Sequence, residues 1–341
     1  MVKVNLRAYA EAATLPPYTE AESLTLDLAL VDPDCLKMPL RGANLTLGWR
    51  RLRIMPRLKS ENVNAKVNQY WDHRFSDKYM DLPLRELDKY LGIPVAQYFT
   101  VQRNGWSIVD HRYADLYEVG RPESLSRLTE KTVLWTAAAL LHVGDEKTKE
   151  WTVEKEGGRS GGRAADPMCL AKWQFRIDSR SDMRVGIIFI PPWQFLLVDL
   201  AEFIDGTNVS QWFNQSAAAP SNHTDHESSN AQLLWARIYD YCYSGGCYHW
   251  LVTTYEYWVF GMFSKDHACG WTTEIYGKDS KDPTILQLVV YWMHSAFEAE
   301  NTLPLPAKPE AEDTRSDESP CHSGRLWATN PKAVMEILSL P

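Results

Sequence analysis

The most regular pattern of apolar and polar positions lies in the second half of the chain. Apolar side chains recur about every 3.6 residues over residues 230–243, which predicts a helix ended by the serine and two glycines that follow. Aromatic and β-branched side chains dominate residues 248–263 and return at 271–276, which favours a strand, a turn and a second strand. Helical spacing resumes after Asp282-Pro283-Thr284, which predicts a second helix. The proline is compatible with this prediction, since proline is tolerated in the first turn of a helix.

Weaker patterns upstream predict further elements. The Asn104-Gly105 pair predicts a hairpin turn, because both residues tolerate positive φ. Further helices are predicted at residues 64–75, 84–91 and 124–143, and further strands at residues 24–31, 45–54, 169–178, 185–190 and 193–203. The connections between the last three strands are short, so these strands should be antiparallel neighbours.

Together these elements predict an α+β fold with an antiparallel or mixed sheet and flanking helices. Residues 1–146 form an N-terminal α+β region, the charged and glycine-rich residues 147–166 a linker or exposed loop, and residues 167–306 the α+β core region. Proline, serine and acidic residues dominate the end of the chain, so we expect residues 307–341 to be a disordered tail.

Composition indicates a packed interior and limits the partners. Of the 341 residues, 45% are hydrophobic and 14 are Trp, 16 Tyr and 10 Phe, whereas disordered chains are poor in aromatic side chains. The formal net charge of −8 disfavours general nucleic-acid binding and attraction to anionic membranes, because both depend on Lys and Arg. No run approaches the ~20 apolar residues that span a bilayer. The 6 cysteines show no disulfide spacing, so we expect an intracellular protein of the cytoplasm or nucleus.

From the last upstream helix onward, the predicted order of elements resembles the core of restriction-endonuclease-like folds. In those folds a helix precedes a three-stranded meander, another helix and another strand. Two acidic residues of that family hold Mg²⁺ and orient the attacking water. One is an Asp near one strand, and the other stands on the next strand, two positions before a Lys. The resemblance places these roles on Asp178 or Asp182 and on Asp199, with Glu202 as an additional carboxylate. Ala201 stands where the family has Lys, which implies a degenerate core.

A second resemblance rests on residues 250–306. These residues look like a family of uncharacterised proteins predicted in mushroom-forming fungi, and more distantly like the non-kinase N-terminal region of fungal-specific kinase-like proteins. The segments that carry the resemblance are Tyr257-Trp258-Val259-Phe260-Gly261, Phe263-Ser264-Lys265, Pro283-Thr284 and Tyr291-Trp292-Met293. This resemblance implies no catalytic assignment.

Two groups of residues have the side chains of metal ligands. The first comprises Cys242, Cys247, His249, His267 and Cys269. If residues 248–263 formed one extended strand at ~3.3 Å per residue, its two ends would lie up to ~50 Å apart, so the sequence predicts no shared zinc site. The second, at residues 223–227, falls in a segment that we interpret as a solvated loop.

The sequence therefore favours a binding or interaction module without a clear catalytic motif or cofactor, with a protein or a small molecule as its partner. The alternative is a metal-dependent phosphodiesterase or nuclease that uses Asp178, Asp182, Asp199 and Glu202 with Mg²⁺. An enzyme with an aromatic-lined pocket for a small molecule is a third class, although aromatic strand residues more often form the core. Trp258, in the most apolar strand segment, is predicted to be buried.

Overall fold

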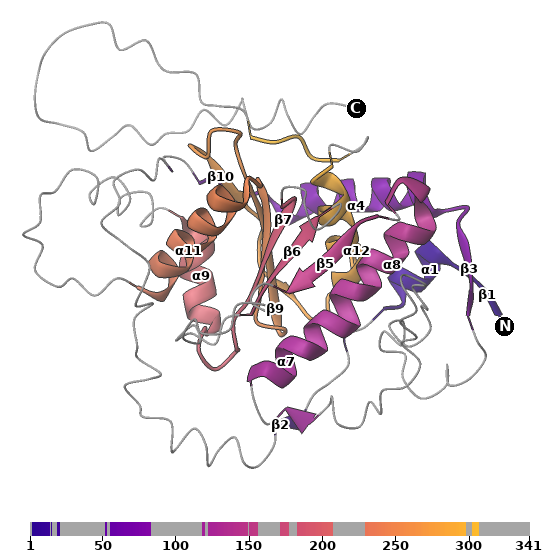
Figure 1. Cartoon of the computed structure of the whole chain (residues 1–341), viewed down its shortest axis with the longest axis horizontal. Helices are drawn as coiled ribbons and strands as arrows, with labels where there is room; N and C mark the ends of the chain where they lie inside the picture. Colours follow the sequence, from indigo (N-terminus) through magenta and orange to yellow (C-terminus); the bar gives the residue numbers. More distant parts are fainter. Residues whose placement is uncertain are drawn as a thin grey trace, which may run out of the picture. The chain divides into compact units, whose positions relative to one another are not determined.

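A seven-stranded mixed sheet lies between two layers of helices in the computed structural model of the protein (Figure 1). Contacts within the chain group Met1–Ala307 into one unit, and the residues after it lie outside the described part. Helices on a mixed sheet confirm the predicted α+β class. The structure describes residues 2–13, 15, 19–20, 52, 55–82, 118–119, 122–148, 150–155, 171–176, 183–206, 229–297 and 302–306.

The strands of the sheet follow the order β10-β9-β8-β7-β6-β5, and β11 pairs with the first part of β9. β5, β6 and β7 are antiparallel neighbours, whereas β7 and β8 are parallel. The parallel register sets Val185 opposite His249, so the amino ends of β7 and β8 lie side by side. The strands are β5 (Thr152–Lys155), β6 (Ala171–Arg176), β7 (Val185–Phe189), β8 (His249–Thr253), β9 (Tyr257–Phe263), β10 (Gly270–Thr272) and β11 (Tyr276–Gly277).

Two helices lie on the crossover that connects the parallel strands β7 and β8, and they cover one face of the sheet. The indole of Trp235 stacks on Phe203 at 4.7 Å between ring centroids and donates a hydrogen bond to the Phe203 carbonyl. Trp250 of β8 contacts both rings, and Gly261 of β9 leaves room for it, because a Cβ there would stand 2.0 Å from the indole. The two helices are α9 (Leu197–Asp205) and α11 (Asn230–Gly245).

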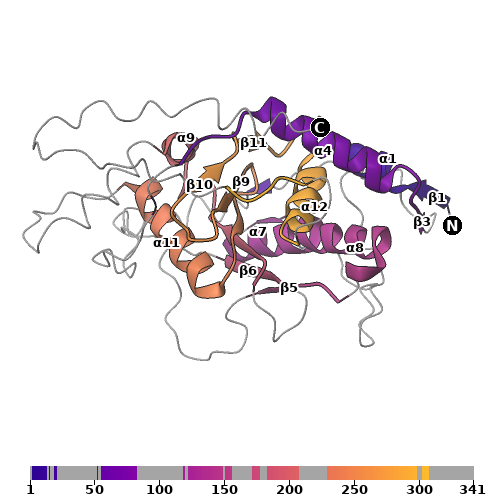
Figure 2. The ribbon, with the colours of Figure 1, turned by 90° about the horizontal axis from the view of Figure 1, so that it is seen from above.

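The other face of the sheet is covered by α12 (Ile285–Ser295), which is buried along its whole length. Figure 2 shows this helix between α4 and α8, with the sheet on its remaining side. Trp292 of α12 donates a hydrogen bond to the carbonyl of Gly261 in the sheet, and Trp71 of α4 donates one to the carbonyl of Gln287. The outer helices are α4 (Ser60–Phe75) and α8 (Trp135–Gly144), the latter preceded by α7 (Pro122–Thr129) and a π-helical turn at Glu130–Leu134.

A chain of polar side chains, buried at Tyr70 and His294 and more exposed at Arg74, joins α4, α12 and the end of α8. The hydroxyl of Tyr70 lies 2.7 Å from Nδ1 of His294, and Nε2 of His294 faces Asp145 at 3.8 Å. Asp145 in turn forms an ion pair with Arg74 of α4. Burial, followed by the positive charge of Arg74, lowers the pKa of His294 to about 4, so this imidazole is neutral at neutral pH.

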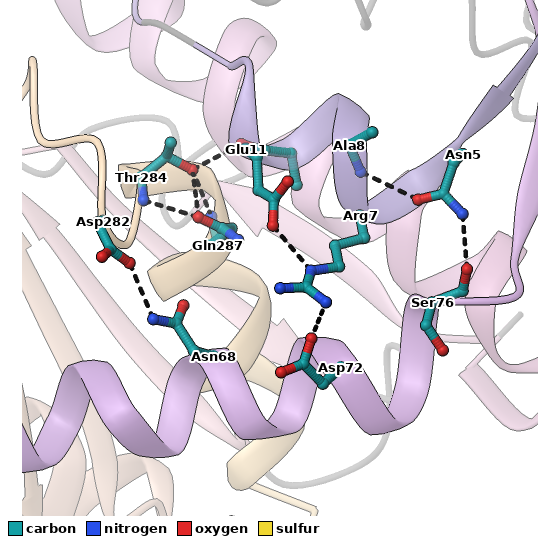
Figure 3. A network of polar contacts seen from close by, with 11 residues as sticks. Asn5, Arg7, Ala8, Glu11, Asn68, Asp72, Ser76, Asp282, Thr284 and Gln287 are labelled. Carbon is teal, nitrogen blue, oxygen red and sulfur yellow. Dashed lines mark hydrogen bonds and ion pairs between the residues drawn. The ribbon is translucent and has the colours of Figure 1, made fainter.

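Figure 3 shows the polar contacts that fasten the N-terminal residues to α4 and to the start of α12. The Thr284 hydroxyl donates to the carbonyl of Ala10 at 2.7 Å and caps α12 by accepting the N–H of Gln287. Arg7 forms ion pairs with Glu11 and with Asp72 of α4. The short elements are β1 (Val2–Asn5), which pairs with β3 (Tyr79–Leu82), α1 (Leu6–Glu11), β2 (Thr19–Glu20), which pairs with β4 (Glu118–Val119), and the 3-10 turn Glu146–Thr148.

Several predicted elements are present with small shifts at their ends. They are the helices at residues 64–75, 124–143 and 230–243 and the strands at residues 169–178 and 185–190. The linker predicted at residues 147–166 is wrong at residues 152–155, because β5 lies there and pairs with β6. Apart from Leu52, the predictions for residues 24–31, 45–54, 84–91, 104–105 and 307–341 lie outside the described residues.

The strand predicted at residues 193–203 is wrong, because the chain turns there and then forms α9. The buried side chains of α9 are Leu200, Phe203 and Ile204, which stand three and four positions apart, as on one face of a helix. Apolar residues without a clear repeat of two or 3.6 are ambiguous in sequence, and packing against α11 decides between the two structures.

The long strand predicted at residues 248–263 is also wrong, because the chain reverses inside it and forms β8 and β9. Tyr255 takes a left-handed φ of 75°, and its N–H donates to the side chain of Thr253. Threonine side chains thus stabilise a turn that contains no Gly, Pro, Asn or Asp, the residues that usually mark a turn in a sequence.

We expect Trp258→Ala to lower the free energy of unfolding by about 3 to 5 kcal/mol, the usual result of emptying a large buried site. The side chain is 0% exposed and its indole donates to the carbonyl of Tyr255 at 2.9 Å. Urea denaturation measures the loss, and Leu197→Ala is the control, because Leu197 is 50% exposed. A loss for Trp258→Ala no larger than that of the control would contradict a core role.

A second substitution tests the contacts of Figure 3 at the start of α12. Thr284→Val removes the hydroxyl and keeps the shape, so we expect a loss of about 1 to 3 kcal/mol from the missing cap and the lost hydrogen bond to the carbonyl of Ala10. Thr284→Ser keeps the hydroxyl and should retain most of the stability. Denaturation measures both losses, and a loss for Thr284→Val no larger than that for Thr284→Ser would mean that the hydrogen bonds of the hydroxyl contribute no more than the packing of the methyl group.

Candidate functional site

A cavity of about 420 Å³ opens at the amino ends of β7 and β8. Five separate segments form its walls: the residues before β7, the end of α11 with the start of β8, the turn after β9, the carboxyl end of α12, and residues 302–305. The lining residues are Met183, Arg184, Gly246, Cys247, Tyr248, His249, Lys265, Ser295, Ala296, Thr302, Leu303, Pro304 and Leu305.

The parallel pairing of β7 and β8 brings two of these walls together. Residues that precede Val185 must lie beside residues that precede His249, because these two positions are partners in the register. Gly246 ends α11 with a left-handed φ of 67°, and the N–H of Cys247 returns to the carbonyl of Cys242 at 3.0 Å. This turn connects the end of α11 to the start of β8, beside the cavity.

His249 is a buried polar residue among those that line the cavity. It is only 4% exposed, and its Nε2 has no hydrogen-bond partner among the described residues. Burial lowers the pKa of His249 to about 3, so the imidazole is neutral at neutral pH. A buried polar atom without a partner destabilises a fold by about 1 to 3 kcal/mol, and a bound molecule could supply the missing hydrogen bond.

Two basic side chains, Arg184 and Lys265, lie at the exposed side of the cavity. The guanidinium of Arg184 stands 5.7 Å from the centroid of the Phe297 ring, which itself stacks on Trp151 at 3.5 Å. Among the described residues, no Asp or Glu lines the cavity. The cavity is therefore locally positive on a chain whose formal net charge is −8.

The structure overturns the distance argument against a shared site of the cysteines and histidines. Because β8 and β9 form a hairpin, Nε2 of His267 lies 3.1 Å from the carbonyl of Cys247 instead of tens of Å away. Cys242 lies next to Cys247, and burial raises the pKa of the Cys242 thiol. The described residues nevertheless contain no group of three or more His, Cys, Asp or Glu side chains placed to hold a metal ion. Residues 223–227 lie outside the described part.

Two of the four acidic residues of the nuclease hypothesis lie on a helix instead of the predicted strand. Asp199 and Glu202 lie on α9 and not on a strand. Asp199 accepts the N–H of Leu196 at 2.8 Å, which caps its own helix, and Glu202 accepts the hydroxyl of Ser229 at the start of α11. Both carboxylates therefore serve helix ends in this structure.

The rest of the nuclease hypothesis concerns Asp178, Asp182 and the order of the elements, and the described residues support only the order. Asp178 and Asp182 lie outside the described part of the chain. The element order itself is present as α8, the meander β5-β6-β7, the helices α9 and α11, and β8, so β7 takes the place that we gave to residues 193–203. The sequence of β7 is Val-Gly-Ile-Ile-Phe, with neither a carboxylate nor a lysine.

Comparison with known proteins adds no assignment, because the chain matches no protein-family model, no curated protein and no solved structure. The resemblance to fungal proteins thus stays a prediction. None of the helices in the described residues is long and apolar enough to cross a membrane.

The sequence contains the lining residues of the cavity but gives no sign that they meet. Arg184 and Lys265 stand 81 positions apart (265 − 184), and each looks like an ordinary solvated charge. Of the lining residues, Cys247 and His249 belong to a group of metal-ligand side chains in the sequence, which indicates zinc and not a cavity. The parallel pairing of β7 and β8 places Arg184 beside His249, and the hairpin of β8 and β9 brings Lys265 to the same end of the sheet.

We expect Mg²⁺ or Mn²⁺ at millimolar concentration to leave the melting temperature of the protein unchanged, since Asp199 and Glu202 already have protein partners. Asp199→Asn should cost about 0.3 to 1 kcal/mol, from the weaker interaction with the helix dipole, with or without metal. Thermal unfolding and incubation with DNA test this expectation. Metal-dependent cleavage that Asp199→Asn abolishes would establish the nuclease alternative.

Proposed function

We propose that the described unit is a binding module without catalytic chemistry of its own, and that the cavity at the amino ends of β7 and β8 is its ligand site. The observation that carries this proposal is His249, a residue that lines the cavity and whose buried imidazole has a nitrogen without a hydrogen-bond partner among the described residues. A polar group in that position lowers stability unless something binds to it, and native proteins satisfy the great majority of their buried polar groups.

The size and lining of the cavity suit a small molecule. A volume of about 420 Å³ lies within the usual range of ligand pockets, which combine apolar walls with a few polar groups. Met183, Leu303 and Leu305 supply apolar surface. The neutral imidazole of His249 can donate one hydrogen bond and accept another, so it recognises a polar group without requiring a charge.

We propose no catalytic role because of the residue types on the strands of the sheet. A metal-dependent nuclease needs carboxylates and a cation grouped on neighbouring strands, and β7 offers only apolar side chains and glycine. No observation in the described residues favours the nuclease alternative over a binding role.

His249→Leu tests the proposal through stability. We expect the variant, without ligand, to unfold with a free energy about 1 to 3 kcal/mol higher than that of the unsubstituted protein, because an unpaired polar group is replaced by an apolar one. His294→Leu is the matched control, since His294 is equally buried but pairs with Tyr70 at 2.7 Å. That variant should be destabilised. If His249→Leu is destabilised as strongly as His294→Leu, the imidazole of His249 is part of the core and not of a site.

The pH dependence of stability gives an independent measure of the same residue. The pKa of His249 falls from an ordinary 6.5 to about 3 in the folded protein, so the unfolded chain takes up the proton first as the pH drops. The contribution of the neutral imidazole is complete above pH 6.5 and is lost as the pH approaches 3. In that window His249→Leu should reduce the slope of unfolding free energy against pH by about 1.4 kcal/mol per pH unit.

Binding itself is tested with 3-phenylpropanol, a neutral probe whose hydroxyl can pair with His249 and whose body suits the apolar walls. Ligand-observed NMR should detect its binding to the unsubstituted protein and a loss of binding to His249→Leu. Binding that is equal in both proteins would place the probe elsewhere.

A further inference from the structure

Resting on the proposed function, we infer that the natural ligand of the cavity is a small organic anion. Its charged end, a carboxylate or a phosphate monoester, meets Arg184 and Lys265, and the rest of the molecule extends inward with a neutral polar group that pairs with His249. The three side chains line one cavity but differ in exposure: Arg184 and Lys265 are exposed, whereas His249 is buried. That difference sets the direction of the ligand, with its charge at the mouth and its neutral part inside.

The charge of the lining decides the sign of the ligand. Among the residues that the structure describes, two with a full positive charge line the cavity and no carboxylate does. The carboxyl ends of α11 and α12 also reach it, at Gly246 and Ser295, and each helix end carries about half a negative charge. Two half charges do not outweigh two full ones, so the cavity favours an anion.

Arg184 is held in a way that leaves its donors available. Its guanidinium lies over the face of Phe297, which restrains the side chain without using its N–H groups. In the described part of the chain, no carboxylate forms an ion pair with Arg184. A planar guanidinium of this kind matches the two oxygens of a carboxylate or a phosphate.

Lys265 stands in a turn that is itself ordered by hydrogen bonds. The carboxylate of Asp266 accepts from the hydroxyl of Ser264 at 2.6 Å and from the N–H of Ala268 at 3.1 Å. The nearest acid in sequence is thus engaged within the turn. Lys265 has no ion pair with any described residue, and its ammonium group provides the second positive charge at the mouth.

The test uses the full chain and four probes that share one body: 3-phenylpropanoate, 3-phenylpropyl phosphate, 3-phenylpropanol and 3-phenylpropylamine. Ligand-observed NMR titrations give their dissociation constants at low ionic strength. We expect one or both anions to bind at least about tenfold more tightly than the alcohol, the difference expected of a charge-assisted hydrogen bond, and the amine to bind most weakly. The two anions distinguish a carboxylate site from a phosphate site.

Arg184→Gln and Lys265→Gln should each weaken anion binding severalfold and leave the affinity for 3-phenylpropanol unchanged. Lys66→Gln on α4 removes the same charge away from the cavity and is the control. If the alcohol or the amine binds as tightly as the anions, the cavity is a site but the inference of an anion is wrong. If none of the four probes binds, the proposed function of the cavity is overturned as well.

Discussion

The burial of α12 on every side is the constraint on which the rest of the structure depends. A helix in that position has no water for its polar groups, so each must find a partner inside the protein. Thr284 caps the amino end and reaches the N-terminal segment, while His294 near the other end meets Tyr70 of α4. The sheet packs on the remaining side through Trp292. The outer helices and the first residues of the chain thus take their places around one helix.

The same helix helps to form the cavity. Its carboxyl end provides one wall, and the parallel strands β7 and β8 provide another because their amino ends are in register. Ligands of open α/β sheets usually bind at the carboxyl ends of the strands, where helix N-termini attract anions. Here the cavity lies at the opposite ends, near helix C-termini. Side chains at the mouth, Arg184 and Lys265, therefore have to provide the positive charge that helix N-termini provide elsewhere.

Hydrogen-bond partners within the chain distinguish the polar groups with a structural role from those of the candidate site. His294 and His249 are both buried, and burial lowers the pKa of each, but only His294 has a hydrogen-bond partner in the described structure. Asp199 and Glu202 resemble catalytic acids in the sequence, yet both bind helix ends. A residue type that suits catalysis is thus weaker support for a site than a polar atom left without a partner beside a cavity.

The sequence alone determined the α+β class and the elements with strong local patterns, such as the helix at residues 230–243 and the strand at residues 185–190, because periodicity and end signals are local properties. It misassigned α9 and missed the reversal at Tyr255, where packing and threonine hydrogen bonds act in place of the usual turn residues. The cavity was decided only by tertiary structure. Arg184 and His249 are distant in sequence, and they meet because β7 and β8 pair in parallel, a long-range contact that no local pattern encodes. Lys265 reaches the same end of the sheet through the hairpin of β8 and β9.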